Sequence, residues 1–351
     1  MTAVSERPPV SRPVRIGLLG CADIARRRTL PAILAEPAAE LVAVAARDTN
    51  KAKVYAKEFG GEVVRDYEAL LARPDVEAVY VPLPAGLHHE WITRALDVGK
   101  HALVEKPLTT RYADTAEVLA LAGARGLTLM ENLTFLRHGL HSTVVNLVTA
   151  GEIGELRAVH GVFGFPPLNP GDIRYRPDLG GGALLDLGVY PLSTARLFLG
   201  PDLEVVGATR TEDPEHGVDV AGGALLCSPD GRTAQIDFGF QHGYRCEYTL
   251  WGSQGSIFVD RAFTPPPTWR PTVRLKRRHD VQELVLPPED QFATTLREFV
   301  TAVRTGGERA GVAERSRTLA GLVDEVRERA RTLRAGQGLP GRGEDLIRRH
   351  R

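Results

Sequence analysis

The sequence predicts an α/β protein in two parts: a doubly wound parallel sheet, then an α/β domain with an open, mainly antiparallel sheet. The first observation is that short apolar runs alternate with amphipathic helical segments as far as about residue 131. This alternation is typical of parallel strands joined by helical crossovers. The second is that strand-like runs between about residues 205 and 260 follow one another without a long helix between them, which favours antiparallel pairing.

The first part contains five apolar runs of strand length, separated by segments with helical spacing. We expect strands at 14–19, 41–46, 78–81, 102–104 and 127–130, and helices at 23–34, 51–59, 87–98 and 112–124. In the second part we expect strands at 234–240, 248–251, 272–276 and 281–286, and helices at 139–149, after Gly182, at 291–303 and at 312–333.

These elements divide the chain into four segments. We expect a disordered leader at 1–13, a dinucleotide-binding domain at 14–131, a domain for substrate binding and oligomerisation at 132–335, and a flexible tail at 336–351.

Composition and charge argue against several classes of partner. The chain has 351 residues, of which 43% are hydrophobic and 25% charged, with a formal net charge of +0. No strong global field therefore favours nucleic acid or an anionic membrane. The apolar runs also fall far short of the roughly 20 residues that span a bilayer. We therefore expect neither nucleic acid nor a membrane as a partner.

The three cysteines, Cys21, Cys227 and Cys246, are scattered and odd in number. They lack the spacing of a zinc site, and no disulfide framework is expected from them. We expect no metal and a location in the reducing cytoplasm.

A glycine turn follows the first predicted strand. A dinucleotide turn needs glycine or another small residue at three positions, and Gly20, Ala22 and Ala25 occupy them. Backbone N–H groups from Ala22 to Ile24 would face the phosphates at a helix start. The alternative is a tight strand-to-helix turn without a ligand. The residues expected to bind the cofactor here are Gly20, Cys21, Ala22, Asp23, Ile24 and Ala25.

The end of the second strand should select the nicotinamide cofactor. An acidic residue there suits the ribose hydroxyls of NAD, and a basic residue suits the extra phosphate of NADP. The expected strand end is Ala46, followed by Arg47, which favours NADPH. Asp48 leaves NAD open, because a shift of one residue would bring an acid closer. Arg26 is expected at the cofactor and Arg28 at the substrate, whereas a solvated helix face is expected for at least one residue of the run 26–28.

Lys106 stands at the carboxyl end of the predicted strand 102–104. Ligands of open parallel sheets bind outside these strand ends, where a lysine can hold a carbonyl oxygen and stabilise developing alkoxide charge. The alternative is a surface lysine beside a proline that starts a helix. Further residues expected to line the cofactor are Leu83, Pro84, His88 and Glu105.

A triple glycine opens the last motif, at 180–190. If this segment is helical, Asp186 and Tyr190 share one face, and a nearby lysine would lower the pKa of the tyrosine and make it a general acid. The alternative is a glycine-rich loop with a buried tyrosine. Arg174, just upstream, is expected to bind substrate phosphate or, equally, to form a salt-bridged loop.

Together the motifs resemble the glucose–fructose oxidoreductase and inositol dehydrogenase (Gfo/Idh/MocA) superfamily over residues 14 to about 334. The resemblance rests on the turn I-G-L-L-G-C-A-D-I-A, on G-K-H-A-L-V-E-K-P-L and on G-G-G-A-L-L-D-L-G-V-Y. Many dehydrogenases of this superfamily end the last motif in histidine. Tyr190 in its place is similar to the sugar 3-ketoreductases of antibiotic deoxysugar pathways, as are the runs M-E-N-L-T-F-L-R-H-G-L-H and R-A-F-T-P-P-P.

The resemblance implies an N-terminal Rossmann dinucleotide-binding domain and a C-terminal α/β domain whose open sheet packs in homo-oligomers. It implies that Lys106 lies beside the reacting carbonyl, that Tyr190 donates the proton, and that Tyr244 and Thr264 approach a nucleotide sugar. The implied activity is NADPH-dependent reduction of the 3-keto group of a dTDP-linked deoxysugar. The alternatives are an NADP-dependent dehydrogenase of a free sugar or trans-dihydrodiol, and a redox sensor without catalysis.

Overall fold

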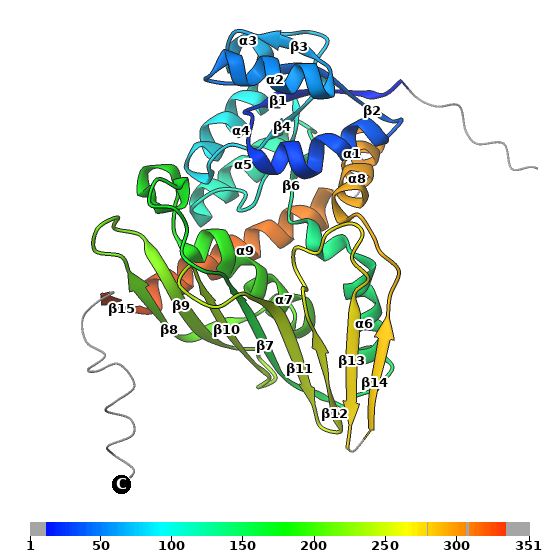
Figure 1. Ribbon diagram of the computed structural model, residues 1–351, viewed down its shortest axis with the longest axis vertical. Coiled ribbons are helices and arrows are strands. Elements are labelled where there is room, and N and C mark those ends of the chain that lie inside the picture. Colours follow the sequence, from blue (N-terminus) through cyan, green and yellow to red (C-terminus); the bar gives the residue numbers. More distant parts are fainter. Residues whose placement is uncertain (1–11, 279, 307–308, 335–351) are drawn as a thin grey trace, which may run out of the picture.

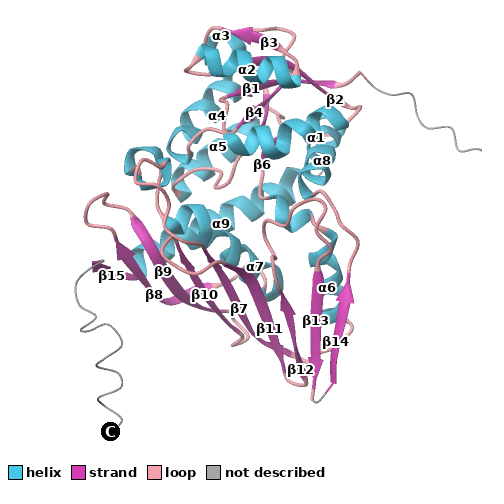
Figure 2. Ribbon diagram, viewed as in Figure 1, coloured by secondary structure: helices cyan, strands magenta, loops and turns pink. Residues whose placement is uncertain are grey.

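Two sheets, one above the other in Figure 1, organise the computed structural model of the protein. The structure describes residues 12–278, 280–306 and 309–334. The expected leader and tail therefore lie almost wholly outside the described residues. Figure 2 shows helices on both sides of the smaller, upper sheet, whereas the larger sheet is a broad curved layer with helices on one side.

The upper sheet is parallel throughout, in the strand order β3-β2-β1-β4-β5-β6. Its strands are β1 (Val14–Leu19), β2 (Ala39–Ala45), β3 (Glu62–Val64), β4 (Ala78–Val81), β5 (His101–Val104) and β6 (Leu129–Glu131). Its helices are α1 (Leu30–Ala35), α2 (Thr49–Phe59), α3 (Tyr67–Leu71), α4 (His88–Asp97) and α5 (Tyr112–Ala124).

The burial of these strands explains their apolar sequences. Every residue of β4 is buried, as expected of a parallel strand covered by helices on both faces. The chain turns from one half of the sheet to the other between β1 and β4. In such a sheet a crevice for ligands forms at this point, outside the carboxyl ends of the strands.

The lower sheet has nine strands in the order β14-β13-β12-β11-β7-β10-β9-β8-β15. All neighbours pair antiparallel except β7 with β10 and β8 with β15, which confirms the expected mainly antiparallel sheet. The strands are β7 (Leu156–Gly164), β8 (Glu204–Glu212), β9 (Asp219–Cys227), β10 (Thr233–Gly239), β11 (Arg245–Gly252), β12 (Gly255–Val259), β13 (Thr272–Arg277), β14 (Asp280–Val285) and β15 (Ala330–Arg334). The helices of the second part of the chain are α6 (Gly139–Thr149), α7 (Val189–Leu199), α8 (Gln291–Thr305) and α9 (Arg309–Arg329).

Three local expectations need correction. The short elements β3 and α3 are absent from the sequence prediction, because three and five residues give too little periodicity. The helix expected over 312–333 ends at Arg329, and the chain continues as β15. β15 forms because it pairs with the edge strand β8. Helical propensity, on which the prediction for 312–333 depended, gives no information on such a pairing. The helix expected over 23–34 begins with a π-helical turn at Ala25–Thr29.

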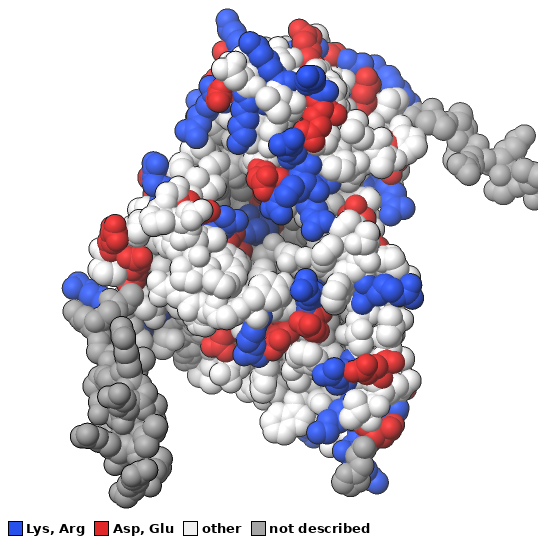
Figure 3. All heavy atoms as spheres, in the orientation of Figure 1, with Lys and Arg blue, Asp and Glu red and all other residues white. Residues whose placement is uncertain are grey.

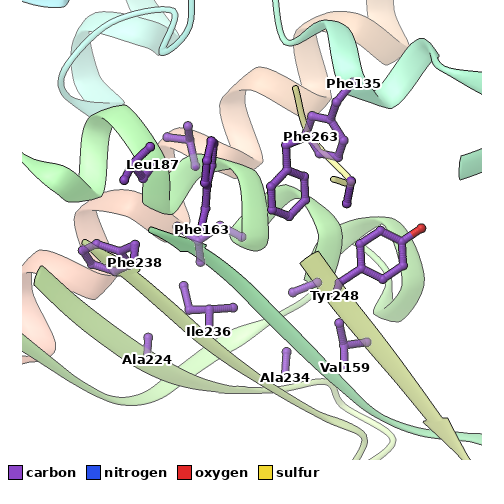
Figure 4. Packing of buried hydrophobic residues seen from close by; sticks show 14 of the residues in the cluster. Phe135, Val159, Phe163, Leu187, Ala224, Ala234, Ile236, Phe238, Tyr248 and Phe263 are labelled. Atoms are coloured by element: carbon purple, nitrogen blue, oxygen red, sulfur yellow. The ribbon is translucent and has the colours of Figure 1, made fainter. Parts of the chain in front are cut away.

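The two C-terminal helices return to the first half of the molecule. The apolar face of α8, including Phe299, belongs to the same buried cluster as Val14 and Ile16 of β1. The apolar side chains of α9 join the cluster between the lower sheet and its helices, part of which Figure 4 shows. The domain limits expected from the sequence stay a prediction. Within the described residues, no helix is long and apolar enough to cross a membrane.

An ion pair fastens α8 to the start of β4. Arg304 of α8 donates to both carboxylate oxygens of Glu77, at 3.0 and 3.2 Å, and the backbone N–H of Arg15 donates to the same carboxylate at 3.1 Å. The bonds from Arg304 lower the pKa of Glu77 from 4.5 to about 2. The pair therefore stabilises the fold at neutral pH and loses this effect as the pH falls from 4.5 towards 2.

We predict that Glu77→Gln lowers the free energy of unfolding at pH 7 by about 1–2 kcal/mol. The difference from the wild type should stay constant down to about pH 4.5 and shrink as the pH falls from there towards 2, because the unfolded wild type then takes up a proton on Glu77 before the folded protein does. Urea unfolding across this range measures it. The control is Glu90→Gln, which breaks an exposed pair with Arg94 and should change stability little. A deficit independent of pH would contradict the prediction.

Candidate active site

Lys106 lies where the two halves of the molecule meet. It follows β5 after one intervening residue, Glu105. Its ammonium donates to the Asp186 carboxylate at 2.7 Å and to the Asp186 backbone carbonyl at 2.8 Å. Only 15% of the lysine side chain and 18% of the aspartate side chain are exposed. The structure thus joins two motifs that lie 80 positions apart in the sequence.

Asp186 connects Lys106 with Arg174. Its second carboxylate oxygen accepts from Arg174 Nε at 2.7 Å, and the same guanidinium also contacts Asp172. Burial alone would raise the pKa of Asp186, but Lys106 and Arg174 lower it to about 2. The aspartate therefore carries its charge at neutral pH and fixes the direction of the lysine. These contacts favour a salt-bridged loop for Arg174 over the binding of substrate phosphate.

Tyr190 stands beside this ion pair, with its ring centroid 5.4 Å from Lys106 Nζ. The rings of Phe135, Phe163 and Phe263 surround it at centroid distances of 5.1–5.6 Å, and Figure 4 shows these three side chains. Burial, followed by the charge of Asp186, raises the pKa of Tyr190 well above 10. The expectation that the lysine lowers this pKa is therefore wrong. The Lys106 ammonium is paired with the Asp186 carboxylate, and the negative charge of that carboxylate raises the pKa of the phenol. The phenol stays protonated at neutral pH.

The glycine-rich segment allows the two halves to touch. A Cβ on Gly180 would lie 2.7 Å from the backbone nitrogen of Gly86, and one on Gly182 would lie 2.4 Å from the Asp219 carboxylate. The helix that follows begins with a π-helical turn at Leu184–Gly188, and Asp219 accepts from the Leu184 backbone N–H at 2.6 Å. The close approach expected of these glycines is thus to the protein's own chain. Asp219 lies in no motif, so only the structure reveals its role.

A buried network lies directly behind Lys106. The Glu105 carboxylate accepts from the Tyr80 hydroxyl at 2.7 Å and from the Asn132 amide at 2.5 Å, and Thr29 donates to the Tyr80 hydroxyl at 2.9 Å. Burial raises the pKa of Glu105. The four residues come from four different segments of the first domain, so the network joins the carboxyl ends of the strands. Tyr80 and Thr29 were missed in the sequence because neither belongs to a recognisable motif.

His88 supports the loops after β4 and β5, and its side chain is occupied by contacts within the protein. It is completely buried, and its ring nitrogens lie 2.9 and 2.8 Å from the carbonyl oxygens of Pro107 and Leu83. Burial lowers its pKa, so the neutral ring donates to one carbonyl at a time. A role of His88 at the cofactor stays a prediction. Its contacts hold the loops after β4 and β5.

Glu131 is a second buried acid behind the lysine loop. Its carboxylate accepts from the Leu108 backbone N–H at 2.9 Å and from the Ser316 hydroxyl at 2.7 Å. It therefore ties the loop after Lys106 to helix α9.

The glycine turn has the geometry that a pyrophosphate requires. Gly20 has φ +103°, and a Cβ there would lie 2.6 Å from the Leu83 side chain, so only glycine fits. Ala25 is buried and Ala22 is half-buried, which leaves the turn free of bulky side chains. Burial raises the pKa of the Cys21 thiol to about 11, so no thiolate opposes an anion here. These features fit a dinucleotide.

Arg47 is exposed beyond the buried Ala46, just after β2 ends. Burial raises the pKa of Tyr67, and the nearby charge of Arg47 opposes this rise. Asp48 accepts from the Asn50 backbone N–H at 2.9 Å and caps α2, so this acid has a structural role. Arg26 pairs with Glu58 at 2.8 Å, which favours the solvated-face alternative for that arginine.

The remaining predicted residues take different positions. Tyr244 is half exposed, and burial of the rest of the ring, with Cys246 nearby, raises its pKa to about 12. Thr264 lies close enough to Tyr244 to oppose part of this rise in pKa, so the structure brings this predicted pair together. Arg28, Asp23, Ile24 and Pro84 are exposed or half-buried around the glycine turn and its neighbouring loop. Figure 3 shows the surface hollowed between the two halves, with lysine or arginine atoms on its walls.

Comparison with known families and structures matches this geometry. The model of the oxidoreductase family with an NAD-binding Rossmann fold (GFO_IDH_MocA) covers residues 14–133, and the model of the family's C-terminal domain covers residues 141–258.

Two similar proteins bear the name dTDP-3,4-didehydro-2,6-dideoxy-alpha-D-glucose 3-reductase. The one from Actinomadura kijaniata is 49% identical, over 93% of this chain and 99% of its own, and the one from Saccharopolyspora spinosa is 53% identical, over 84% and 89%. A crystal structure of KijD10, a 3-ketoreductase from Actinomadura kijaniata, contains NADP and TDP-benzene. It matches with a TM-score of 0.91 and 50% identity, over 92% of this chain and 99% of its own.

Further KijD10 structures with the same two ligands carry a tyrosine-to-phenylalanine or a lysine-to-alanine substitution. The matched family models and the identity to these reductases over nearly the whole chain show that the protein belongs to the Gfo/Idh/MocA oxidoreductase family.

Proposed function

We propose that the protein reduces the 3-keto group of a dTDP-linked keto-deoxysugar with NADPH. The observation that carries this proposal is the meeting of the Lys106 ammonium, held by Asp186, with the protonated Tyr190 phenol at the carboxyl ends of the strands. The similar reductases supply the substrate class. The lysine and the tyrosine altered in KijD10 are separated by the same number of residues as Lys106 and Tyr190, which supports their catalytic roles.

NADPH, when bound, supplies the hydride. The glycine turn would hold its pyrophosphate and Arg47 its 2′-phosphate. Lys106 would donate a hydrogen bond to the carbonyl oxygen and stabilise the negative charge that develops there. The protonated Tyr190 phenol would pass its proton to the same oxygen. Asp186 would keep the ammonium aimed into the crevice. A redox sensor without catalysis would not need Lys106, Tyr190 and Asp186 in this arrangement.

The outer face of the lower sheet is the proposed contact with a second copy of the chain. On three of its strands an exposed apolar side chain follows a buried neighbour, as with Val206 in β8 and Trp251 in β11. Within the described residues, the helices packed on this sheet, such as α7 and α9, cover the other face (Figure 2). Such an apolar face is typical of an interface. Light scattering of the purified protein tests for a dimer or tetramer, and a monomer would contradict the proposal.

The catalytic roles can be separated by single-turnover oxidation of NADPH at saturating cofactor. Lys106→Ala should slow this step by about 10²–10⁴-fold, since the lysine stabilises charge in the transition state. Binding of NADPH should be nearly unchanged. Tyr190→Phe should slow it less if Lys106 or water can supply the proton. The exposed Lys53→Ala is the matched control. A near wild-type rate for Lys106→Ala would refute the assignment, and one for Tyr190→Phe alone would make Lys106 the proton donor.

Arg47 should decide the preference between the two nicotinamide cofactors. Arg47→Ala removes a charge-assisted contact with the 2′-phosphate, so it should weaken NADPH binding by about 10–100-fold. NADH, which lacks that phosphate, should bind almost as before. Fluorescence titration of both cofactors measures the two dissociation constants. Equal losses for NADPH and NADH would show that the arginine acts elsewhere.

The substrate class is tested without any turnover. Free dTDP should raise the melting temperature, because a ligand that binds only the folded state stabilises it by mass action, by about 2.7 kcal/mol at a concentration of 100 Kd. It should also compete with the keto-sugar in assays. Absence of a shift, together with oxidation of free xylose or glucose by NADP⁺, would instead identify a free-sugar dehydrogenase.

A further inference from the structure

A chain of four alternating charges ends at the catalytic lysine, in the order Asp172, Arg174, Asp186 and Lys106. The Nε atom of Arg174 donates to Asp186 Oδ2 at 2.7 Å, and its Nη1 atom lies 3.2 and 3.3 Å from the carboxylate oxygens of Asp172. Asp186 Oδ1 in turn accepts from the Lys106 ammonium at 2.7 Å. The Arg174 side chain is 39% exposed, so this arginine supports the less exposed inner pair from the solvent side.

The position of Arg174 is set by its own loop. Its backbone N–H donates to the Asp172 carboxylate at 2.9 Å, and its carbonyl oxygen accepts from the Gly182 backbone N–H at 2.9 Å. A Cβ on Gly181 would lie 2.5 Å from the same carbonyl oxygen, so only glycine allows this approach. The backbone that carries the guanidinium is therefore fixed relative to the turn that carries Asp186.

Two cations fix the plane of the Asp186 carboxylate. The terminal torsion of an aspartate has broad minima, so a carboxylate held by one cation can rotate. Here Lys106 binds Oδ1 and Arg174 binds Oδ2. The Asp186 carboxylate and backbone carbonyl together accept two of the three N–H groups of the ammonium. The third N–H is left for another acceptor, and its direction depends on the plane that Arg174 fixes.

We propose that Arg174 is a positioning residue of the reduction, which holds the Asp186 carboxylate so that the third N–H of Lys106 points at the carbonyl oxygen of the substrate. Arg174 itself would touch neither the reacting carbon nor the cofactor. The inference rests on the proposed function and extends it. It gives the arginine a part in the chemical step in place of a contact with substrate phosphate.

The kinetics of the keto-sugar reduction separate positioning from binding. Arg174→Gln should lower kcat by about 10–100-fold, because the ammonium loses its direction, and should change KM and the Kd of dTDP by less than about threefold. Arg174→Lys should recover part of kcat, since its ammonium can bind Asp186 Oδ2. The matched control is Arg176→Gln, which breaks an exposed pair with Asp178 in the same loop and should keep the wild-type kcat. A rise in KM and Kd at unchanged kcat would make Arg174 a substrate ligand and overturn the proposal.

The acid limb of the pH profile separates positioning from a simple tether of the loop. Burial raises the pKa of Asp186, and the charges of Lys106 and Arg174 lower it to about 2. Arg174→Gln removes one of these cations, so the pKa of Asp186 rises and the acid limb of kcat should move to higher pH. Arg174→Lys keeps the charge and should keep the limb near its wild-type position. A fall in kcat by the same factor at every pH would overturn the proposal.

Other ionisable groups near this pair do not obscure the comparison. They are Glu105 after β5, Tyr190 in α7 and Asp219 at the start of β9. Tyr190 stays protonated throughout the acid range, because its pKa lies well above 10. Arg174 bonds to neither Glu105 nor Asp219 in the described part of the chain, so their titration is common to the wild type and the variant. A shift of the limb between the two proteins therefore reports Asp186.

A double-mutant cycle tests whether Arg174 acts through Asp186. Asp186→Asn should slow the reduction by itself. In that background Arg174→Gln should lower kcat by less than about a further threefold, because no charged carboxylate is left to hold. If the two losses multiply in full, the arginine acts independently of Asp186 and the proposal is overturned.

The wild type distinguishes a failure of the inference from a failure of the proposed function. If it does not reduce the dTDP-linked keto-sugar, the proposed function is overturned together with the inference. If it is active and Arg174→Gln has an equal kcat, the inference alone is overturned.

Discussion

The ion pair between Lys106 and Asp186 is the contact on which the site depends, because it links the two halves of the molecule at the crevice. Both side chains are largely withdrawn from water, and a buried charge whose partner is removed destabilises a protein by about 3–5 kcal/mol. The surrounding structure satisfies both charges. Arg174 neutralises the second aspartate oxygen, and the glycines at 180–182 let the backbone that carries Asp186 approach the first domain.

This pairing also explains why Tyr190 stays neutral. A free ammonium beside a phenol would favour the phenolate, but Asp186 accepts the lysine's bonds at 2.7 and 2.8 Å and adds a negative charge near the ring. Three aromatic rings pack against Tyr190, and its burial raises its pKa in the same direction as the charge of Asp186. One carboxylate therefore orients the Lys106 ammonium and keeps the neighbouring phenol protonated.

The sequence predicted most of the first domain and the central pair of the site, and the reason is local. Strands buried on both faces are continuous apolar runs, and Gly20, Lys106 and Tyr190 each occupy a motif position next to such an element. The features that the sequence could not predict depend on contacts between residues far apart in the chain. The strand β15 exists because β8 offers an unpaired edge. The burial of His88 depends on Pro107, which lies 19 residues away. The pKa of Tyr190 depends on the pairing of Lys106 with Asp186, which lies 80 residues away from it in the sequence.

The same reasoning explains why the contacts of Arg261 with Tyr244 and Trp269 were not predicted from the sequence, although Tyr244 itself was named there. Tyr244 precedes β11, and Arg261 and Trp269 lie on the long connection between β12 and β13, so no helical or strand period relates them. Their proximity follows from the antiparallel pairing of β11 with β12, which brings the start of one strand beside the end of the other. The lower sheet and the loop after β12 thus supply two features: the rings of Phe163 and Phe263, which pack against the Tyr190 phenol, and Arg261, which has no carboxylate partner among the described residues. A substrate with a neutral reacting end and an anionic distal end matches that division of polarity.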